Sequence, residues 1–148
     1  MSGFTALVIG ATGATGTELV QQLMDDNRYS SVVVFSRRPL LVTGAKLTTH
    51  IVDFDNPQAW AHLVKGDVLF SALATTLKQA GSQKEQYKID YTYQYQTAAT
   101  AAANGVAKYV LISAMGANAK SLLFYPRIKG ELDNAASALP FKQIHIFR

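Results

Sequence analysis

An apolar run that ends in three evenly spaced glycines constrains the fold more than any other feature of this chain. The run and the glycines together read ALVIGATGATG and span Ala6–Gly16. The apolar residues predict a buried strand, and the glycines predict a sharp turn that leads into a helix. A helix start offers free N–H groups and the positive end of the helix dipole, which suits a pyrophosphate. The predicted dinucleotide phosphate site consists of Gly10, Ala11, Thr12, Gly13, Ala14, Thr15 and Gly16.

The spacing of these glycines narrows the class of nucleotide. The pattern is G-x-x-G-x-x-G, whereas many dehydrogenases carry G-x-G-x-x-G. The alanines and threonines between the glycines are small enough to keep the backbone close to a phosphate. The chain lacks the G-x-x-x-x-G-K pattern, which disfavours a P-loop nucleoside triphosphatase.

Strand-like and helix-like segments alternate along the chain. The predicted strands are Thr5–Ile9, Ser31–Phe35, Leu47–Val52, Val68–Leu73, Tyr109–Ile112 and Phe141–Phe147. The predicted helices are Thr17–Asp26, Pro57–Val64, Gln83–Asn104 and Tyr125–Leu139. This alternation predicts an α/β fold with a doubly wound parallel sheet, the Rossmann fold. The 148 residues suffice for about one domain, so we expect residues 1–148 to form a single NAD(P)-binding domain.

The composition excludes several classes of protein. The chain has no cysteine, and His50, His62 and His145 lack the spacing of metal ligands, so we expect no metal site. The net charge of +4 comes from lysines and arginines spread along the sequence, which disfavours a nucleic-acid partner. We find no export signal and no apolar stretch of about 20 residues, so we expect no membrane partner and a cytoplasmic location.

Two positions beyond the second and third strands bear on which cofactor binds. Ser36, Arg37 and Arg38 stand where an acidic residue would accept hydrogen bonds from the adenosine ribose of NAD. Guanidinium groups there would instead clamp a 2′-phosphate, which predicts NADP(H). The alternative is a solvated arginine pair at a strand end. Asp53 and Phe54 could flank the adenine, although Asp53 could equally cap a turn.

A tyrosine and a lysine four residues apart predict the reactive site. On a helix, Tyr125 and Lys129 share one face. The phenol of an ordinary tyrosine titrates near pKa ~10, and a nearby ammonium group would favour its ionised form.

The end of the fourth predicted strand is a further candidate for cofactor contact. It consists of Leu73, Ala74 and Thr75, which would pass beside the cofactor. The alternative is a plain strand-to-loop junction.

The predicted helix Gln83–Asn104 carries bulky side chains in its first half and small ones in its second half. Tyrosines give way to a run of small residues, Ala98–Ala103, that lets another element approach closely. The simpler interpretation is packing against the sheet. The alternative is a homodimer formed through Gln83–Asn104 and Tyr125–Leu139.

The chain resembles the short-chain dehydrogenase/reductases, and within them the atypical NmrA-like members. It looks most similar to the oxidoreductases similar to Tat-interacting protein. The resemblance lies in GATGATG at Gly10–Gly16, SRRP at Ser36–Pro39, ATTLKQAGS at Ala74–Ser82, ID at Ile89–Asp90, GANAKS at Gly116–Ser121 and YPRIKGELD at Tyr125–Asp133. It covers nearly the whole length from Leu7 to Arg148.

This resemblance implies roles for individual residues. It implies that Tyr125 is the catalytic acid/base and that Lys129 holds the cofactor ribose and lowers the pKa of the tyrosine. Family members often carry paired serines after the fifth strand, where this chain has Ser113 and Ala114. The resemblance therefore suggests Ser113 for substrate polarisation, with Ser121 as second choice.

The expected function is NADP(H)-dependent hydride transfer to or from a small carbonyl or alcohol of unknown identity. The alternative is a non-catalytic NADP(H)-sensing regulatory protein of the NmrA-like type. A sugar-nucleotide epimerase ranks last because the chain has no room for a substrate domain. Members of the resembled family continue past the sixth strand, so with an end at Arg148 we expect either a truncated form or an open pocket.

Overall fold

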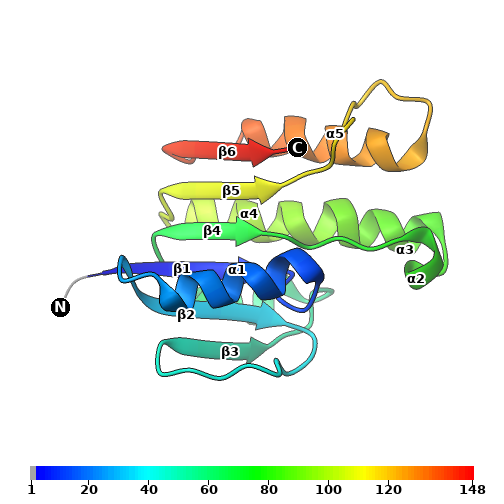
Figure 1. The fold of residues 1–148 in the computed structure, drawn as a ribbon. Helices are drawn as coiled ribbons and strands as arrows, with labels where there is room; N and C mark the ends of the chain where they lie inside the picture. Colours follow the sequence, from blue (N-terminus) through cyan, green and yellow to red (C-terminus); the bar gives the residue numbers. More distant parts are fainter. Residues whose placement is uncertain (1–2) are drawn as a thin grey trace.

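The computed structural model describes residues 3–148, which build one parallel six-stranded sheet (Figure 1). The strand order is β3-β2-β1-β4-β5-β6. The strands are β1 (Phe4–Ile9), β2 (Tyr29–Ser36), β3 (Leu47–Ile51), β4 (Val68–Ser71), β5 (Lys108–Ile112) and β6 (Gln143–Phe147). The order reverses between β1 and β4, and in open parallel sheets ligands bind at the carboxyl ends of strands at such a point. The predicted doubly wound α/β fold is confirmed.

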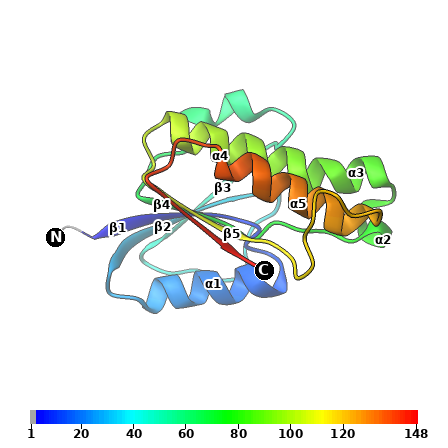
Figure 2. The ribbon, with the colours of Figure 1, turned by 90° about the horizontal axis from the view of Figure 1, so that it is seen from above.

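Helices cover the two faces of the sheet unequally (Figure 2). The helices are α1 (Ala14–Asp25), α2 (Leu77–Ala80), α3 (Gln83–Tyr87), α4 (Gln94–Ala103) and α5 (Phe124–Ser137). Helix α1 lies on one face of the sheet, and α4 and α5 lie side by side on the other. Among the described residues, no helix is long and apolar enough to cross a membrane.

The alternation of side chains along β1 divides the core into two clusters. Leu7 and Ile9 pack toward α4 and α5, whereas Ala6 and Val8 pack toward α1. All four side chains are fully buried, as expected for a central strand that is covered on both faces. The core therefore fixes β1, and with it the start of the glycine loop.

Two predicted helices have a different local structure. Residues Pro57–Val64 form two short 3₁₀ turns, η1 (Pro57–Ala59) and η2 (Ala61–Leu63), and Asn56 makes no side-chain cap. The segment from Gln83 to Asn104 contains a π-helical stretch, η3 (Lys88–Tyr93), between α3 and α4. Helix α2 was not predicted, because four residues are too few to show a helical period.

The small residues of α4 pack inward. Ala98 and Ala101 are fully buried in the cluster shared with the sheet, which agrees with the simpler interpretation of this helix. Helix α4 ends at Ala103 with Asn104 as its C-cap, and Gly105 follows with a φ of 87°. The homodimer stays a prediction.

Candidate functional site

A cavity of about 650 Å³ opens at the carboxyl ends of the strands, where the strand order reverses. Its lining comes from the glycine loop, the segment after β2 and the segment after β4, together with the first helices that follow. Of the residues predicted to bind the cofactor, it contains Gly10, Thr12, Gly13, Arg37, Arg38, Leu73, Ala74 and Thr75. These residues are distant in sequence, and the parallel sheet brings their strand ends together.

The glycine loop is built to approach a phosphate closely. Gly10 has a φ of 85°, and a β-carbon there would overlap the backbone of Ala72. A β-carbon on Gly16 would overlap the carbonyl of Gly10, so the helix start packs directly on the loop. The hydroxyl of Thr17 donates to the Ala11 carbonyl over 3.1 Å and fixes the turn.

Helix α1 begins without any side-chain partner for its first amides. Its N-cap is Gly13, no side-chain oxygen accepts a hydrogen bond there, and the first turn contains no acidic residue. A β-carbon on Gly13 would find no atom nearer than the Gly10 carbonyl oxygen at 3.8 Å, so the space above it is open. Free amides, the positive helix end and open space fit a pyrophosphate.

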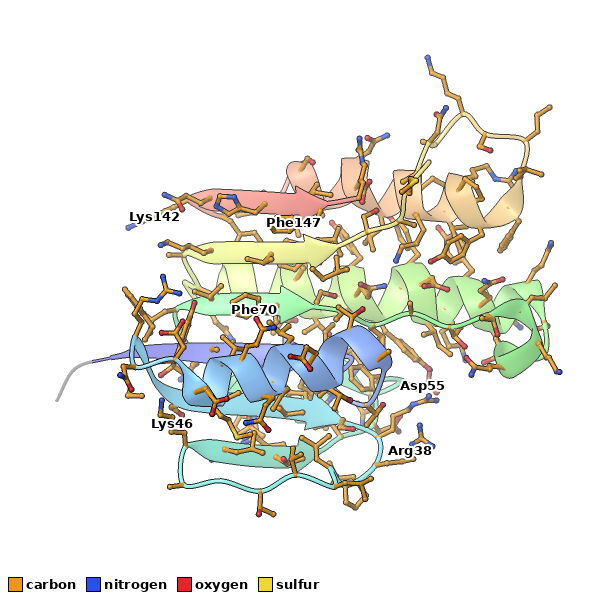
Figure 3. All side chains as sticks on the ribbon, viewed as in Figure 1. Arg38, Lys46, Asp55, Phe70, Lys142 and Phe147 are labelled. Carbon is orange, nitrogen blue, oxygen red and sulfur yellow. The ribbon has the colours of Figure 1, made fainter. Side chains whose placement is uncertain are left out.

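Two guanidinium groups stand at the edge of this cavity. Ser36 ends β2 with a buried side chain, and its hydroxyl oxygen accepts a hydrogen bond from the amide of Arg38 over 3.2 Å. Arg37 and Arg38 are exposed, and within residues 3–148 neither forms an ion pair. Figure 3 shows Arg38 and Asp55 at one end of the molecule and Lys46 and Lys142 at the other. The arginines fit an additional anionic group on the ligand.

Asp53 and Phe54 have different positions. The Asp53 carboxylate accepts a hydrogen bond from the amide of Asp55 over 2.9 Å, so it caps a turn and does not line the cavity. Phe54 is buried and stacks on Tyr93, with 5.4 Å between ring centroids. Its side chain still reaches a small hollow beside Gly10, Ala11 and Arg37.

Sequence reasoning missed a polar contact next to this hollow. The Tyr93 hydroxyl donates to the Asp55 carboxylate over 2.7 Å. This hydrogen bond lowers the pKa of Asp55, while burial and the same carboxylate raise the pKa of Tyr93. Tyr93 lies in the π-helical stretch, so the contact ties that stretch to the segment after β3.

Tyr125 lines a second, more apolar cavity of about 640 Å³. The cavity shares the lining residues Ala74, Thr75 and Gln79 with the first one, so the two cavities adjoin. Its other lining residues are Thr76, Leu77, Gln83, Gln86, Phe124 and Tyr125, none of which is charged. Tyr125 is 37% exposed, which leaves its phenol accessible from the cavity.

Lys129 lies on the same helix but is buried, with only 1% of its surface exposed. Its ammonium nitrogen is 3.6 Å from a carboxylate oxygen of Asp90, which is fully buried. Burial lowers the pKa of Lys129 and raises the pKa of Asp90 to about 6. No sequence period could have revealed this pair, because the two residues belong to separate elements.

The pKa of Tyr125 differs from the expectation. Burial and the negative charge of Asp90 raise it above 10.0, and Lys129 does not lower it. The Lys129 ammonium is instead next to Asp90, at 3.6 Å. The phenol therefore carries its proton at neutral pH.

Ser113 follows β5 directly, and its amide donates to the carbonyl of Phe147 over 2.7 Å. Its hydroxyl is buried and has no hydrogen-bond partner among the described residues. Ser113 is therefore at the expected strand end, but no hydrogen bond joins it to Tyr125.

Comparison with known proteins identifies the family. A family model described as NAD(P)H-binding matches residues 10–138. The protein FMP52, mitochondrial, of Debaryomyces hansenii is 35% identical over 149 residues, which cover 97% of this chain and 65% of that protein. The proteins of the same name in Saccharomyces cerevisiae and Candida glabrata are 37% and 38% identical and are covered to 63% and 64% of their lengths. The chain thus spans slightly less than two thirds of these relatives.

Solved structures show the same fold. MoeE5 in complex with UDP-glucuronic acid and NAD superposes with a TM-score of 0.80 at 21% identity, over 97% of this chain and 54% of that one. A short-chain dehydrogenase from Burkholderia cenocepacia in complex with NADP gives a TM-score of 0.74 at 14% identity, over 98% of this chain and 70% of that one.

The comparisons correct two expectations from the sequence and establish the family of the chain. The expected cytoplasmic location is wrong, because the relatives at 35–38% identity are named as mitochondrial proteins. The similarity to the Tat-interacting oxidoreductases is not shown, since these relatives have a different name. The matched residues 10–138 include the glycine loop and all of α5, and the fold is that of solved NAD-binding and NADP-binding proteins. The chain belongs to the NAD(P)H-binding family.

Proposed function

We propose that the chain is an NADP(H)-dependent oxidoreductase of the short-chain type that acts on a small, uncharged carbonyl or alcohol. One observation carries the proposal. The cavity at the glycine loop and the apolar cavity at Tyr125 adjoin and share the lining residues Ala74, Thr75 and Gln79. A dinucleotide and a small substrate would therefore meet at the carboxyl end of β4.

The preference for NADP(H) rests on Arg37 and Arg38. The free amides at the start of α1 would hold the pyrophosphate, and the two guanidinium groups would bind a 2′-phosphate with charge-assisted hydrogen bonds. The small hollow that both arginines line contains no carboxylate, whereas Glu85 lines the larger cavity beside it.

The chain's own residues would manage the proton and the orientation of the substrate. When bound, the nicotinamide supplies or accepts the hydride. Tyr125 would donate its proton to the substrate oxygen during reduction, and its raised pKa keeps that proton in place at neutral pH. Lys129 would hold the ribose, and the buried Ser113 hydroxyl, which lacks a partner among the described residues, would polarise the substrate oxygen.

The lining of the Tyr125 cavity supports an uncharged substrate. Phe124 and Leu77 offer apolar contacts, and the polar groups are amides and hydroxyls. A substrate carboxylate would lose its hydration there without gaining a positive partner, which is costly. Neutral aldehydes, ketones and quinones are therefore the substrates to test.

A titration with NADPH and NADH tests the cofactor assignment. The wild-type chain should bind NADPH at least tenfold more tightly, and Arg37→Ser/Arg38→Ser should remove that preference, because the charge-assisted bonds to the 2′-phosphate are lost. Arg28→Ser removes an exposed guanidinium that is paired with Asp26 and should leave the preference unchanged. Equal weak binding of NADPH and NADH by the wild type would contradict the assignment.

Turnover of NADPH with neutral carbonyl compounds tests the reaction. Tyr125→Phe should lower the rate by about 10²- to 10⁴-fold while NADPH affinity is kept. Tyr95→Phe, which removes a phenol on α4 that lines neither cavity, is the matched control. If the wild-type chain binds NADPH but none of the carbonyl compounds leads to its oxidation, the chain is a binding protein and the proposed reaction is wrong.

A further inference from the structure

Asp90 and Lys129 form a buried pair of opposite charges that the proposed reaction does not explain. Asp90 lies in the π-helical stretch η3 and Lys129 lies in α5, and the two elements pack against each other. The exposed fractions of the two side chains are 0% and 1%. Burying two charges is costly and a buried pair is weak evidence for stability, so its presence beside a ligand cavity suggests a role.

The pair lies directly behind the wall of the cofactor cavity. Ile89, the residue before Asp90, lines that cavity, and so does Thr75. The Thr75 amide and the Gln86 side chain both lie close enough to Asp90 to lower its pKa against the effect of burial. The Gln86 amide group also donates to the Thr75 carbonyl over 3.4 Å. Asp90 therefore lies next to the segment after β4 that would pass beside the cofactor.

The hydrogen bonds of the pair are incomplete. The 3.6 Å separation between Lys129 and Asp90 is too long for a hydrogen bond. Among the described residues, neither the Lys129 ammonium nor the two Asp90 carboxylate oxygens have a hydrogen-bond partner. An ammonium group has three N–H donors, so Lys129 is held by charge while its donors stay free.

The remaining charged groups around the pair are few. Asp133, which is buried on the same helix as Lys129, also favours the charged form of Lys129. Its carboxylate is paired with Arg148 at 3.0 Å. The charge of Asp90 also raises the pKa of Tyr125, which lies on the same helix as Lys129. Asp90 is thus the carboxylate that pairs with Lys129 on the side of the cavity.

We propose that Asp90 is a positioning residue whose buried carboxylate holds the Lys129 ammonium, with its N–H donors free for the ribose hydroxyls of a bound dinucleotide. This inference rests on the proposed function, which gives Lys129 its contact with the cofactor. Without the carboxylate, the ammonium would have no counter-charge on that side and would turn toward Asp133 or lose its proton. Either change removes the ribose contact.

A double-mutant cycle on NADPH binding tests the proposal. Asp90→Asn keeps the shape of the side chain and should weaken NADPH binding on the order of tenfold at pH 7.5, as should Lys129→Met. The double variant should bind no more weakly than Lys129→Met alone, because Asp90 acts through Lys129. Asp25→Asn on α1 serves as the control for the change in net charge.

A pH series separates positioning from a general structural effect. The ratio of wild-type to Asp90→Asn affinity should be about ten at pH 7.5 and should approach one near pH 5, where Asp90 takes up a proton. The 2′-phosphate also titrates near pH 6. That change affects both proteins and cancels in the ratio.

The outcomes distinguish this inference from the proposed function. If Asp90→Asn binds NADPH as tightly as the wild type does, the role of Asp90 is overturned, while the proposed function stands. The same holds if Asp90→Asn weakens NADPH binding equally in the wild-type and the Lys129→Met background. NADPH binding by Lys129→Met at the wild-type level overturns the role of Lys129, and the inference with it. If Asp90→Asn does not fold, the ratio of wild-type to Lys129→Met affinity is measured from pH 5 to pH 7.5. A ratio that does not change with pH overturns the inference.

Discussion

Gly13 and Gly16 belong to the same loop but have opposite steric surroundings. A β-carbon on Gly16 would overlap the Gly10 carbonyl, whereas one on Gly13 would project into open space beside the cofactor cavity. Gly16→Ala should therefore lower the free energy of unfolding by at least about 2 kcal/mol. Gly13→Ala should cost less than about 1 kcal/mol but weaken NADPH binding at least tenfold.

Urea denaturation and an NADPH titration on both variants measure the two effects. The contrast is the informative result, because each variant is the control for the other. Weakened binding without lost stability in Gly16→Ala would show that the helix start can move away from the loop. Unchanged binding in Gly13→Ala would place the pyrophosphate elsewhere.

The buried carboxylate of Asp90 should also give the stability of the protein a characteristic pH dependence. Its pKa is about 6 in the folded chain, against 3.8 for an ordinary aspartate, so the folded state holds more protons between these values. The contribution of Asp90 to the free energy of unfolding is therefore greatest below pH 3.8 and is lost as the pH rises through 6. The difference between the two pKa values corresponds to at most about 3 kcal/mol.

The measurement is the free energy of unfolding of the wild type minus that of Asp90→Asn, taken by urea denaturation from pH 4 to pH 7. The difference should become less favourable to the wild type as the pH rises, because the ionised carboxylate is buried. Other carboxylates contribute equally to both proteins and cancel. A difference that is constant across this range would mean that Asp90 titrates at its ordinary value.

At the scale of elements, a buried glutamine connects β4 to the helix behind it. The hydroxyl of Ser71 donates to the side-chain oxygen of Gln94 over 2.7 Å, and the Gln94 amide donates to the carbonyl of Asp90 over 3.1 Å. Gln94→Leu should lower the free energy of unfolding by about 1–3 kcal/mol, because it removes the acceptor of the buried Ser71 hydroxyl. Ser71→Ala in the same chain should restore part of the loss, since both ends of the bond are then apolar.

Urea denaturation of the single and double variants checks this coupling, with the exposed Gln22→Leu on α1 as control. The control should change the free energy of unfolding by less than about 0.5 kcal/mol. Additive losses in the double variant would mean that the two side chains act separately. The prediction would then be wrong.

The elements that the sequence predicts well are those with long apolar runs. The residues of β1, from Ala6 to Ile9, are fully buried, so their pattern directly reflects their environment. The segment Pro57–Val64 has helical spacing but only 3₁₀ turns, because it packs Trp60 against Phe35 and Phe54 instead of completing a helix. The π-helical stretch could not be predicted from the sequence either, because its extra residue per turn is set by contacts with α5 and not by local preference.

At the scale of the whole molecule, strand order decides which residues meet. The glycine loop, the arginines after β2 and Leu73–Thr75 could be predicted at one site, because each follows a strand whose carboxyl end faces the same crevice. The pairing of Lys129 with Asp90 could not be predicted, because it depends on how η3 packs on α5. Sequence patterns therefore specified the backbone contribution to the site better than its buried charges.

The position of the two arginines at the rim leads to a final prediction about the stability of the whole molecule. A ligand at about 100 times its dissociation constant stabilises the folded state by about 2.7 kcal/mol, which for a chain of this size raises Tm by roughly 5–10 °C. At low salt, NADPH should raise Tm more than NADH does, because Arg37 and Arg38 are exposed and free of ion pairs within residues 3–148. Exposed charges are screened over about 8 Å at physiological ionic strength and over about 3 Å at 1 M. The difference in Tm between the NADPH and NADH complexes should therefore shrink as NaCl is raised to 1 M, and in Arg37→Ser/Arg38→Ser it should be small at every salt concentration. A difference that resists salt would place the discrimination in buried groups instead of the two arginines.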